Sequence, residues 1–310
     1  MVKTVSIVVP CFNEEANIRR FYNEILSLEI GVELLFVDDG STDMTWNKIK
    51  ELDVSRQGVN VVGIRFTKNF GKEAAIEAGL KKCSGELIIT IDSDLQHPVE
   101  LIPQMINLWE RNKDIHIVNA VKINRQKESI FRKVLTYIYY SIFKLCTGIK
   151  LENHSDFKLI DRTVLNEYLK LKEKNKFYRG LTNWLGFNTI DLEFEPNQRQ
   201  EGTQSWSTFS LLKYAKNSIL SFSYLPLKII SFVGILSIVL SFILMVHTLY
   251  QKINGTSAEG FPTIILIQLG MGSVILFSIG ILAEYISEIY KEIKSRPTYI
   301  VDKEYREKDE

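Results

Sequence analysis

The chain has 310 residues, a net charge of +1 and three cysteines. This length suits one sizeable domain with an appendage, and the balanced charge argues against nucleic acid as a partner. Cys11, Cys83 and Cys146 are far apart and match no metal-binding spacing, so we expect a reduced, cytoplasmic compartment rather than a disulfide framework. Because Met1 leads directly into a predicted strand, we expect no signal peptide.

The first 121 residues alternate between β-rich runs and helical patterns. Strands are predicted at Thr4–Val9, Glu33–Val37, Val59–Ile64, Leu87–Ile91 and Ile115–Val121. Helices are predicted at Glu14–Leu28, from a Ser41 or Thr42 cap to Leu52, and from Lys72 to Leu80. This alternation indicates an α/β domain with an open, mostly parallel sheet and helices on both faces. Ligands of such sheets bind outside the carboxyl ends of the strands.

Two carboxylates, Asp92 and Asp94, directly follow the fourth predicted strand. Residues two apart on a strand point the same way, and hard oxygen ligands so placed suit Mg²⁺ or Mn²⁺ bound together with substrate phosphates. The pattern Asp-x-Asp alone also occurs in ordinary surface turns. The polar segments that follow the first and second strands fall on the same sheet edge, which favours a metal–diphosphate site.

The alternation ends after Lys122. Residues 130–145 are rich in aromatic and aliphatic side chains, with Arg132, Lys133 and Lys144 among them. Two interpretations fit this stretch equally: a core helix with a solvated basic edge, or a helix that lies on a membrane surface with its basic side towards anionic head groups.

The last third of the chain contains two uncharged stretches, between Lys228 and Lys252 and between Glu259 and Glu284. Each is long enough to span about 30 Å of hydrocarbon, and neither has the polar face of a buried soluble helix. The short connection makes them a hairpin, in which glycines would allow close helix contact: Gly234, Gly270, Gly272 and Gly280. Lys and Arg flank the hairpin on its outer sides, so both ends are predicted to face the cytoplasm.

These patterns predict the domain boundaries. They are a cytoplasmic domain at 1–205, an interfacial amphipathic helix at 206–227, transmembrane helices at 229–250 and 261–283, an extracytoplasmic loop at 251–260, and a cytoplasmic tail at 284–310. The tail after Val301 has a disordered composition. A nucleotide-type domain tethered to a bilayer suggests a soluble activated donor and a lipid acceptor.

Six motifs occur in order along the chain. They are Val8-Val9-Pro10-Cys11-Phe12-Asn13-Glu14-Glu15, Phe36-Val37-Asp38-Asp39-Gly40-Ser41-Thr42-Asp43, Asn69-Phe70-Gly71-Lys72-Glu73-Ala74-Ala75, Asp92-Ser93-Asp94-Leu95-Gln96-His97-Pro98, Asp156-Phe157-Lys158-Leu159-Ile160-Asp161-Arg162 and Arg199-Gln200-Glu201-Gly202-Thr203-Gln204-Ser205-Trp206. Together they resemble the family-2 glycosyltransferases, and within them the polyprenyl-phosphate branch of bactoprenol glucosyltransferases and dolichol-phosphate-mannose synthases. The resemblance covers essentially the whole chain and implies a GT-A (Rossmann-like) domain.

The resemblance implies roles on the donor side. Donor-binding candidates are Pro10, Phe12, Glu14, Asp39, Lys72, Asp92, Ser93 and Ser205. An aromatic ring and a carboxylate after the first strand suit a nucleobase, although an ordinary strand-to-helix turn is the alternative for Phe12 and Glu14. Lys72 approaches donor oxygens or is a solvated helix lysine, while Asp38 and Asp43 shape and cap the turn. Ser205 and Trp206 belong to a loop that closes over the donor.

Metal and acceptor ligands are implied in the same way. Asp94 is the first choice as ligand for Mg²⁺ or Mn²⁺, with Asp92 and Gln96 beside it, whereas His97 is interpreted as structural. Asp156 resembles the catalytic base of this branch, and we leave open whether it is a base or an orienting group, because His154-Ser155 stands where relatives commonly carry glycine. Catalytic candidates are Asp156, Asp92, Asp94 and Arg199; candidates for the lipid phosphate are Arg125, Arg132, Lys133 and Arg199.

The resulting prediction is an inverting glycosyltransferase that moves one hexose, most plausibly glucose from UDP-glucose, to undecaprenyl phosphate on the inner face of a bacterial-type plasma membrane. Rival donors are GDP-mannose and a UDP-N-acetylhexosamine. A processive synthase is disfavoured because its Gln-x-x-Arg-Trp signature is missing. A catalytically silent partner of a lipid flippase is the rival from another class. The resemblance also implies a homo-oligomer, a flippase and a downstream glycosyltransferase as partners.

Overall fold

The computed structural model describes residues 4–52, 58–123, 141, 154–174, 176–195, 197, 225–255, 260–294 and 296–306. They fall into two compact units. The sheet unit contains the described residues up to 197 together with 296–306, and the hairpin unit contains 225–294.

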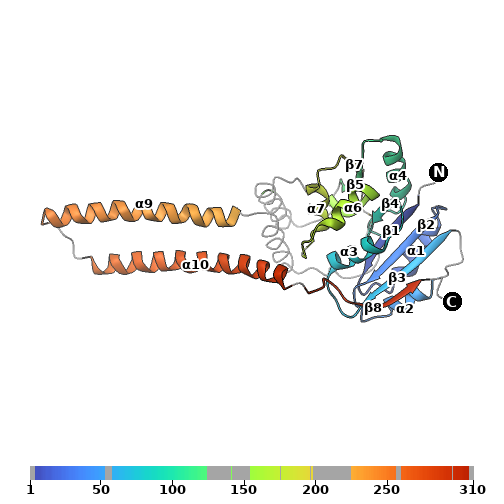
Figure 1. Cartoon of the computed structure of the whole chain (residues 1–310), viewed down its shortest axis with the longest axis horizontal. Coiled ribbons are helices and arrows are strands. Elements are labelled where there is room, and N and C mark those ends of the chain that lie inside the picture. Colours follow the sequence, from blue (N-terminus) through green and yellow to red (C-terminus); the bar gives the residue numbers. More distant parts are fainter. Residues whose placement is uncertain are drawn as a thin grey trace. The chain divides into compact units, whose positions relative to one another are not determined.

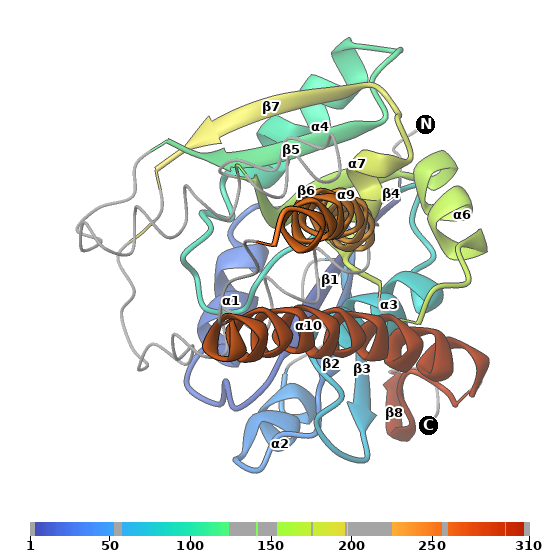
Figure 2. The ribbon, with the colours of Figure 1, turned by 90° about the vertical axis from the view of Figure 1, so that its left-hand side faces the viewer.

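The sheet unit is built on an eight-stranded sheet of order β7-β5-β6-β4-β1-β2-β3-β8 (Figure 2). The strands are β1 Val5–Cys11, β2 Val32–Asp38, β3 Val59–Phe66, β4 Leu87–Thr90, β5 Ile117–Lys122, β6 His154–Asp161, β7 Thr189–Phe194 and β8 Val301–Arg306. The four strands β4, β1, β2 and β3 are parallel, as the alternation of strands and helices predicts. β6 lies antiparallel between β4 and β5, so the sheet is mixed at this side.

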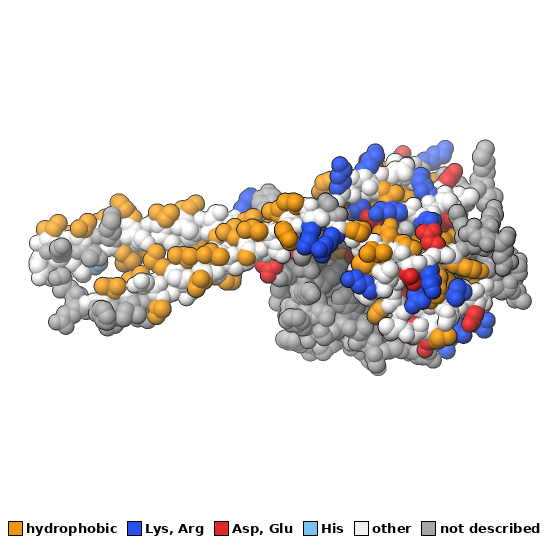
Figure 3. All heavy atoms as spheres, turned by 60° about the horizontal axis from the view of Figure 1, so that its bottom comes forward, with side chains coloured by type: hydrophobic (Ala, Val, Ile, Leu, Met, Phe, Trp, Pro, Cys, Tyr) orange, Lys and Arg blue, Asp and Glu red, His pale blue; other side chains and the backbone are white. Residues whose placement is uncertain are grey.

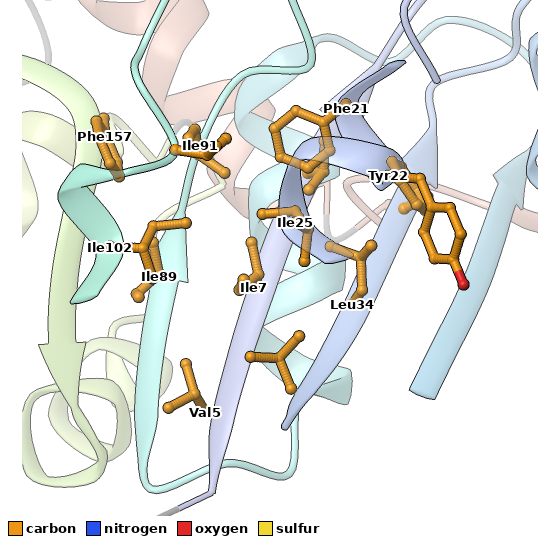
Figure 4. Close-up of a cluster of buried hydrophobic side chains, with 14 of the residues drawn as sticks. Val5, Ile7, Phe21, Tyr22, Ile25, Leu34, Ile89, Ile91, Ile102 and Phe157 are labelled. Carbon is orange, nitrogen blue, oxygen red and sulfur yellow. The ribbon is translucent and has the colours of Figure 1, made fainter. Parts of the chain in front are cut away.

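Helices cover both faces of the sheet. They are α1 Ile18–Leu26, α2 Thr45–Lys50, α3 Lys72–Lys82, α4 Leu101–Arg111, α6 Arg162–Lys170 and α7 Tyr178–Trp184. Side chains of α1, α2 and α4 share one core with the strands, and Figure 4 shows Phe21 and Ile25 of α1 in the cluster that contains Ile7 and Leu34. Successive strand residues point to opposite faces, so Val37 of β2 joins the separate core formed with the alanines of α3.

Close packing of α3 on β1 requires a glycine at position 79. A Cβ at Gly79 would lie 2.3 Å from Cγ1 of Val8, which is buried in β1. We expect Gly79→Val to lower the free energy of unfolding by about 3 kcal/mol because overpacking displaces the helix. Denaturation of the purified protein in detergent measures this loss, with Gly31→Val as the matched control, since the nearest atom to a Cβ at Gly31 is 3.8 Å away. Equal losses in the two variants would contradict the packing argument.

The described residues after Val301 form a strand, so the prediction of a disordered tail is wrong for residues 301–306. β8 pairs antiparallel with β3 at the edge of the sheet. The ring of Tyr299 stacks on Phe66, with centroids 4.8 Å apart, and Lys82 forms a 2.6 Å ion pair with Glu304. Backbone pairing and these contacts order a charged sequence, and charged side chains are typical of an edge strand.

The hairpin unit consists of α9 (Leu225–Ile253) and α10 (Phe261–Ile293), which run antiparallel (Figure 1). The stretches Leu227–Gln251 and Ile267–Tyr290 are long and apolar enough to cross a membrane, and their hydrophobic side chains are exposed along the helices (Figure 3). Such a continuous apolar surface is suited to contact with a membrane. Among the described residues, nothing lies within 4 Å of a Cβ built at Gly234, Gly270, Gly272 or Gly280, so no described residue makes use of the close approach that these glycines allow.

Candidate active site

The loops after β1 and β2 are joined by side-chain hydrogen bonds. The Asn13 amide donates to Oγ of Ser41 at 2.9 Å, and Oδ1 of Asn13 accepts from the Thr42 amide at 2.9 Å. Asn13 has a positive φ of 55°, which asparagine tolerates better than most residues. The Glu14 amide donates to Oγ1 of Thr45 at 2.8 Å. These bonds fix the positions of the first two motifs relative to each other.

The predicted helix cap at Ser41 or Thr42 is wrong. α2 begins at Thr45, and the Thr45 amide donates to Oδ1 of Asp43 at 3.0 Å. Asp38 accepts from the Ser41 amide at 2.9 Å, so Asp38 and Asp43 shape the turn as predicted. Ser41 and Thr42 instead form hydrogen bonds with Asn13. This contact joins two loops that are distant in the sequence, so local sequence patterns do not predict it.

Asp39 connects the loop at the end of β2 to the loop at the end of β3. Its Oδ1 accepts from the Phe70 amide at 2.6 Å and its Oδ2 from the Gly71 amide at 2.9 Å. Burial raises the pKa of Asp39, and these two amide donors oppose the shift. Gly40 beside it has φ +68°, and a Cβ there would lie 2.3 Å from the Lys68 carbonyl carbon. The Asp39 carboxylate therefore anchors the loop that leads to Lys72.

The donor-side candidates of the first motif lie at the end of β1. The Phe12 side chain is 43% exposed, so its ring is accessible to a base. Pro10 and Glu14 are half-buried. Oε2 of Glu14 accepts from Nδ2 of Asn17 at 2.5 Å, a contact that shapes the entry to α1. The arrangement is compatible with a nucleobase and with an ordinary strand-to-helix turn.

Four charged side chains of alternating sign meet at the carboxyl edge of the parallel strands. Nζ of Lys72 lies 2.5 Å from Oδ1 of Asp92 and 2.9 Å from Oδ2 of Asp156. Nη2 of Arg179 lies 3.1 Å from Oδ1 of Asp156. We call Asp92, Lys72, Asp156 and Arg179 the charge chain. The interpretation of Lys72 as a solvated helix lysine is therefore wrong.

The charge chain keeps its members ionised. Burial alone would raise the pKa of Asp156, but the charges of Arg179 and Lys72 outweigh it and hold that pKa far below its ordinary value. Burial likewise opposes the charge on Lys72, yet Asp156 and Asp92 raise the pKa of Lys72 well above its usual range. At neutral pH, two carboxylates and two cations therefore face one another in this site.

Asp94 and Gln96 lie beyond the charge chain in the turn after β4. Oδ1 of Asp94 accepts from the Gln96 amide at 3.2 Å, and Leu95 between them has φ +57°. Both side chains are half-buried, whereas Ser93 is buried. In the part of the chain that the structure describes, no three His, Cys, Asp or Glu side chains converge as a complete metal site. The carboxylates nevertheless have the oxygen chemistry of Mg²⁺ or Mn²⁺ sites that rely on water and substrate phosphates for further ligands.

His97 is a structural residue, as predicted. It is 3% exposed and packs between Phe157 and Phe194, with ring centroids 5.4 and 5.6 Å away. Neither ring nitrogen has a hydrogen-bond partner among the described residues. Burial lowers the pKa of His97 to about 3, so the ring is neutral at physiological pH.

Three charged residues of the site have no predicted role in the sequence analysis: Arg179, Glu73 and Lys158. Arg179 lies in a segment without any motif, so the sequence gives no signal for it. Lys158 shares a face of β6 with Asp156 because the two are two residues apart. It is fully buried, its Nζ donates to Oγ1 of Thr182 at 2.7 Å, and it lies 5.4 Å from the Tyr178 ring centroid. The sequence signal that could have identified Lys158 is its position in the motif that begins at Asp156.

A pH dependence of stability follows from Lys158. Burial lowers the pKa of Lys158 to about 7, and the Arg179 charge adds to this shift. Between pH 7 and about 10.4, the unfolded chain binds a proton that the folded chain has lost, so stability rises by up to about 1.4 kcal/mol per pH unit. We expect the wild type to gain stability over Lys158→Met from about pH 7.5 to about pH 9.5, measured by denaturant unfolding. Burial raises the pKa of Glu73 to about 8, so Glu73 titrates in the same pH range. Because Glu73 is present in both proteins, its contribution cancels in the difference between them. A pH-independent difference would contradict the assignment.

Several predicted site residues lie outside the described residues. They are Arg125, Arg132, Lys133, Arg199 and Ser205, with Trp206 of the same loop. Residues 130–145, apart from Ser141, and the predicted interfacial helix up to residue 224 lie there as well, so the two interpretations of residues 130–145 stay open.

The structure defines an α/β domain with ion-paired side chains at the carboxyl edge of its parallel strands, followed in the chain by an apolar hairpin. Comparison with known proteins identifies the family. Residues 6–169 match glycosyl transferase family 2, and residues 225–289 match the GtrB C-terminal hairpin. The chain belongs to glycosyl transferase family 2.

Relatives of similar length align with nearly the whole chain. A bactoprenol glucosyl transferase of Shigella flexneri, derived from prophage SfII, is 36% identical over 97% of this chain and 98% of its own length. An uncharacterised glycosyltransferase of Bacillus subtilis, YkcC, is 37% identical over 97% of this chain and 94% of its own. Glucosyl-3-phosphoglycerate synthase of Mycobacterium tuberculosis, crystallised with Mn²⁺, UDP-glucose and phosphoglyceric acid, has a TM-score of 0.47 at 19% identity, covering 71% of this chain and 78% of that one.

Proposed function

We propose that the protein transfers one glucose from UDP-glucose to undecaprenyl phosphate with inversion at the anomeric carbon, on the cytoplasmic face of a bacterial-type plasma membrane. The observation that carries the proposal is the charge chain, which brings Asp92 of the Asp-x-Asp turn next to Asp156 through Lys72. The full-length alignment with bactoprenol glucosyl transferases supports the sugar and the lipid.

The donor would lie over the carboxyl ends of β1, β2 and β4. Phe12 offers an exposed ring for the base. Asp39 holds the loop that contains Phe70 and Gly71, and by family resemblance we propose that it also contacts the nucleoside. Asp94, with Asp92 or Gln96, would hold Mg²⁺ or Mn²⁺, and a bound cation would neutralise the diphosphate leaving group. Since Asp92 is paired with Lys72 at 2.5 Å, Asp94 is our first choice of ligand.

The acceptor would be the lipid phosphate monoester. The second pKa of such a phosphate is about 6. The lipid phosphate is therefore largely a dianion at neutral pH and a good nucleophile. Its oxygen forms the bond to the anomeric carbon on the side opposite UDP, the carbon–oxygen bond to UDP breaks, and a β-linked product results. Positioning and stabilisation of the leaving group are therefore the main demands on the protein. Arg125, Arg132, Lys133 and Arg199 stay candidates for the phosphate on sequence grounds.

The hairpin would anchor the enzyme where this lipid is found. Lys228 precedes it and Lys291, Lys294 and Arg296 follow it, against Lys252 alone in the connection. By the positive-inside rule both ends would lie in the cytoplasm, together with the active site. The boundaries at 205, 227 and 284 are part of this proposal, as are the homo-oligomer, flippase and downstream transferase partners.

A panel of labelled nucleotide sugars, added to membranes that contain the protein, tests the donor and the lipid. We expect UDP-glucose to place acid-labile label on an extractable lipid, and membranes without the protein to give none. Label from GDP-mannose or a UDP-N-acetylhexosamine alone would reassign the sugar. Absence of transfer from every donor, together with no metal-dependent nucleotide binding, would favour a catalytically silent partner of a flippase.

A further inference from the structure

Both oxygens of Asp156 are engaged by cations from two different helices. Oδ1 accepts a hydrogen bond from Nε of Arg179 at 3.2 Å and lies 3.1 Å from its Nη2, so two nitrogens of the guanidinium face this oxygen. Oδ2 faces Nζ of Lys72 at 2.9 Å. The Asp156 carbonyl also accepts a hydrogen bond from Thr90. The carboxylate is thus held at each oxygen and along its backbone.

The helices that supply these cations are tied to each other next to the site. Lys72 and Glu73 open α3, and Tyr178 and Arg179 open α7. The Tyr178 amide donates to Oε2 of Glu73 at 2.9 Å, directly beside the link through Asp156. One turn further along α7, Thr182 accepts from the buried Lys158. The direction of the Arg179 side chain is therefore set by the same elements that carry Asp156 and Lys72.

We propose that Arg179 and Lys72 meet the acceptor phosphate, and that Asp156 is a positioning residue, an ion-paired anchor that aims these two cations rather than a base that takes a proton. The inference rests on the proposed function and deepens it. The Lys72 side chain is 35% exposed and that of Arg179 is 20% exposed, against 13% for Asp156. An incoming phosphate would consequently meet the cations before the carboxylate.

The chemistry balances without a proton acceptor. The dianionic phosphate oxygen forms the bond to the anomeric carbon, the bond to UDP breaks, and UDP leaves with the electron pair. No proton changes place. A carboxylate held between two cations is a weak base, because protonation would leave both cations without a counter-ion. Among the described residues, the charged or titratable groups that face Asp156 are Lys72 and Glu73 of α3, Asp92 and His97 after β4, Lys158 of β6, and Tyr178 and Arg179 of α7.

A double-mutant cycle tests the positioning role. We expect Arg179→Gln to lower kcat/KM for the lipid on the order of 30-fold, the effect of losing a charged hydrogen-bonded partner. Arg179→Lys should recover part of this loss because it restores the charge without the planar fork. Asp156→Asn combined with Arg179→Gln should be no worse than Asp156→Asn alone, since the two residues act as a unit. Independent, multiplying losses would overturn the proposal.

The matched control is Arg111→Gln, a change at an exposed arginine at the end of α4, and it should leave turnover unchanged. Unfolding midpoints of all variants separate lost positioning from lost folding: they should lie close to that of the wild type. If Arg179→Gln lowers the unfolding midpoint enough to account for its loss of turnover, and Arg179→Lys restores neither the midpoint nor the turnover, the role of Arg179 is structural and the proposal fails.

A pH profile distinguishes anchor from base. Without a protein base, the acid limb of kcat/KM for the lipid should follow the second ionisation of the acceptor. It should therefore move to higher pH when a polyprenyl phosphonate, whose second ionisation is higher, replaces the phosphate, and the shift should persist in Arg179→Gln. An acid limb that stays fixed when the acceptor changes would show a titrating protein base and overturn the proposal. Failure of the wild type to transfer glucose at all would instead contradict the proposed function.

Discussion

Asp94→Asn is expected to lower glucosyl transfer by about 10²- to 10³-fold, while the protein still folds and binds membranes. The carboxylate lies in the half-buried turn directly after β4, where the proposed function places a cation at the diphosphate. An asparagine keeps the shape of the turn, including the contact from the Gln96 amide, but removes the charge. Turnover measured against increasing Mn²⁺ or Mg²⁺ should show a much weaker response to the metal.

The matched control for this change is Asp114→Asn, in the exposed connection between α4 and β5. It alters net charge equally and should leave turnover within about twofold, because surface substitutions away from special features change little. Full turnover by Asp94→Asn with purified donor and lipid would contradict the metal assignment.

Asp39→Asn is expected to weaken donor binding and stability together. Both carboxylate oxygens of Asp39 accept backbone N–H groups, from Phe70 and Gly71. An amide can present an oxygen to only one of them, so a buried donor loses its partner at a cost of about 1–3 kcal/mol. The loop that leads to Lys72 should loosen, and KM for the nucleotide sugar should rise about tenfold or more.

Calorimetric titration with UDP and denaturant unfolding measure the two effects of Asp39→Asn. Asp114→Asn again serves as the control of equal charge. If UDP binding is lost while stability is unchanged, Asp39 contacts the nucleoside directly without serving as a loop anchor. If both are unchanged, neither role holds.

The four parallel strands β1 to β4 can be predicted from the sequence because each strand is marked by its own residues and by those that directly follow it. The strands β1 to β4 are short apolar runs, each followed by a polar motif, and the rule for parallel sheets places those motifs at one edge. Asp92 is predicted as a site residue from its place directly after a strand, and Asp156 from the resemblance to a family. The structure brings both to the same lysine.

What the sequence does not predict depends on contacts between distant segments. β6 enters between β4 and β5 in antiparallel orientation, and pairing partners are not encoded in a strand's own pattern. β8 has the composition of a solvated tail and is ordered by β3 and Tyr299. Arg179 is missed because an arginine in a short helix gives no signal until Asp156 is placed beside it.

Reconstitution of the purified protein in liposomes that contain undecaprenyl phosphate tests the central claim most directly. With labelled UDP-glucose and Mn²⁺ or Mg²⁺, the account predicts release of UDP and formation of one β-linked glucosyl lipid in equal amounts, both dependent on the lipid phosphate and on the metal. UDP release that does not depend on the lipid, or an α-linked product, would contradict an inverting transfer to a lipid phosphate at this site.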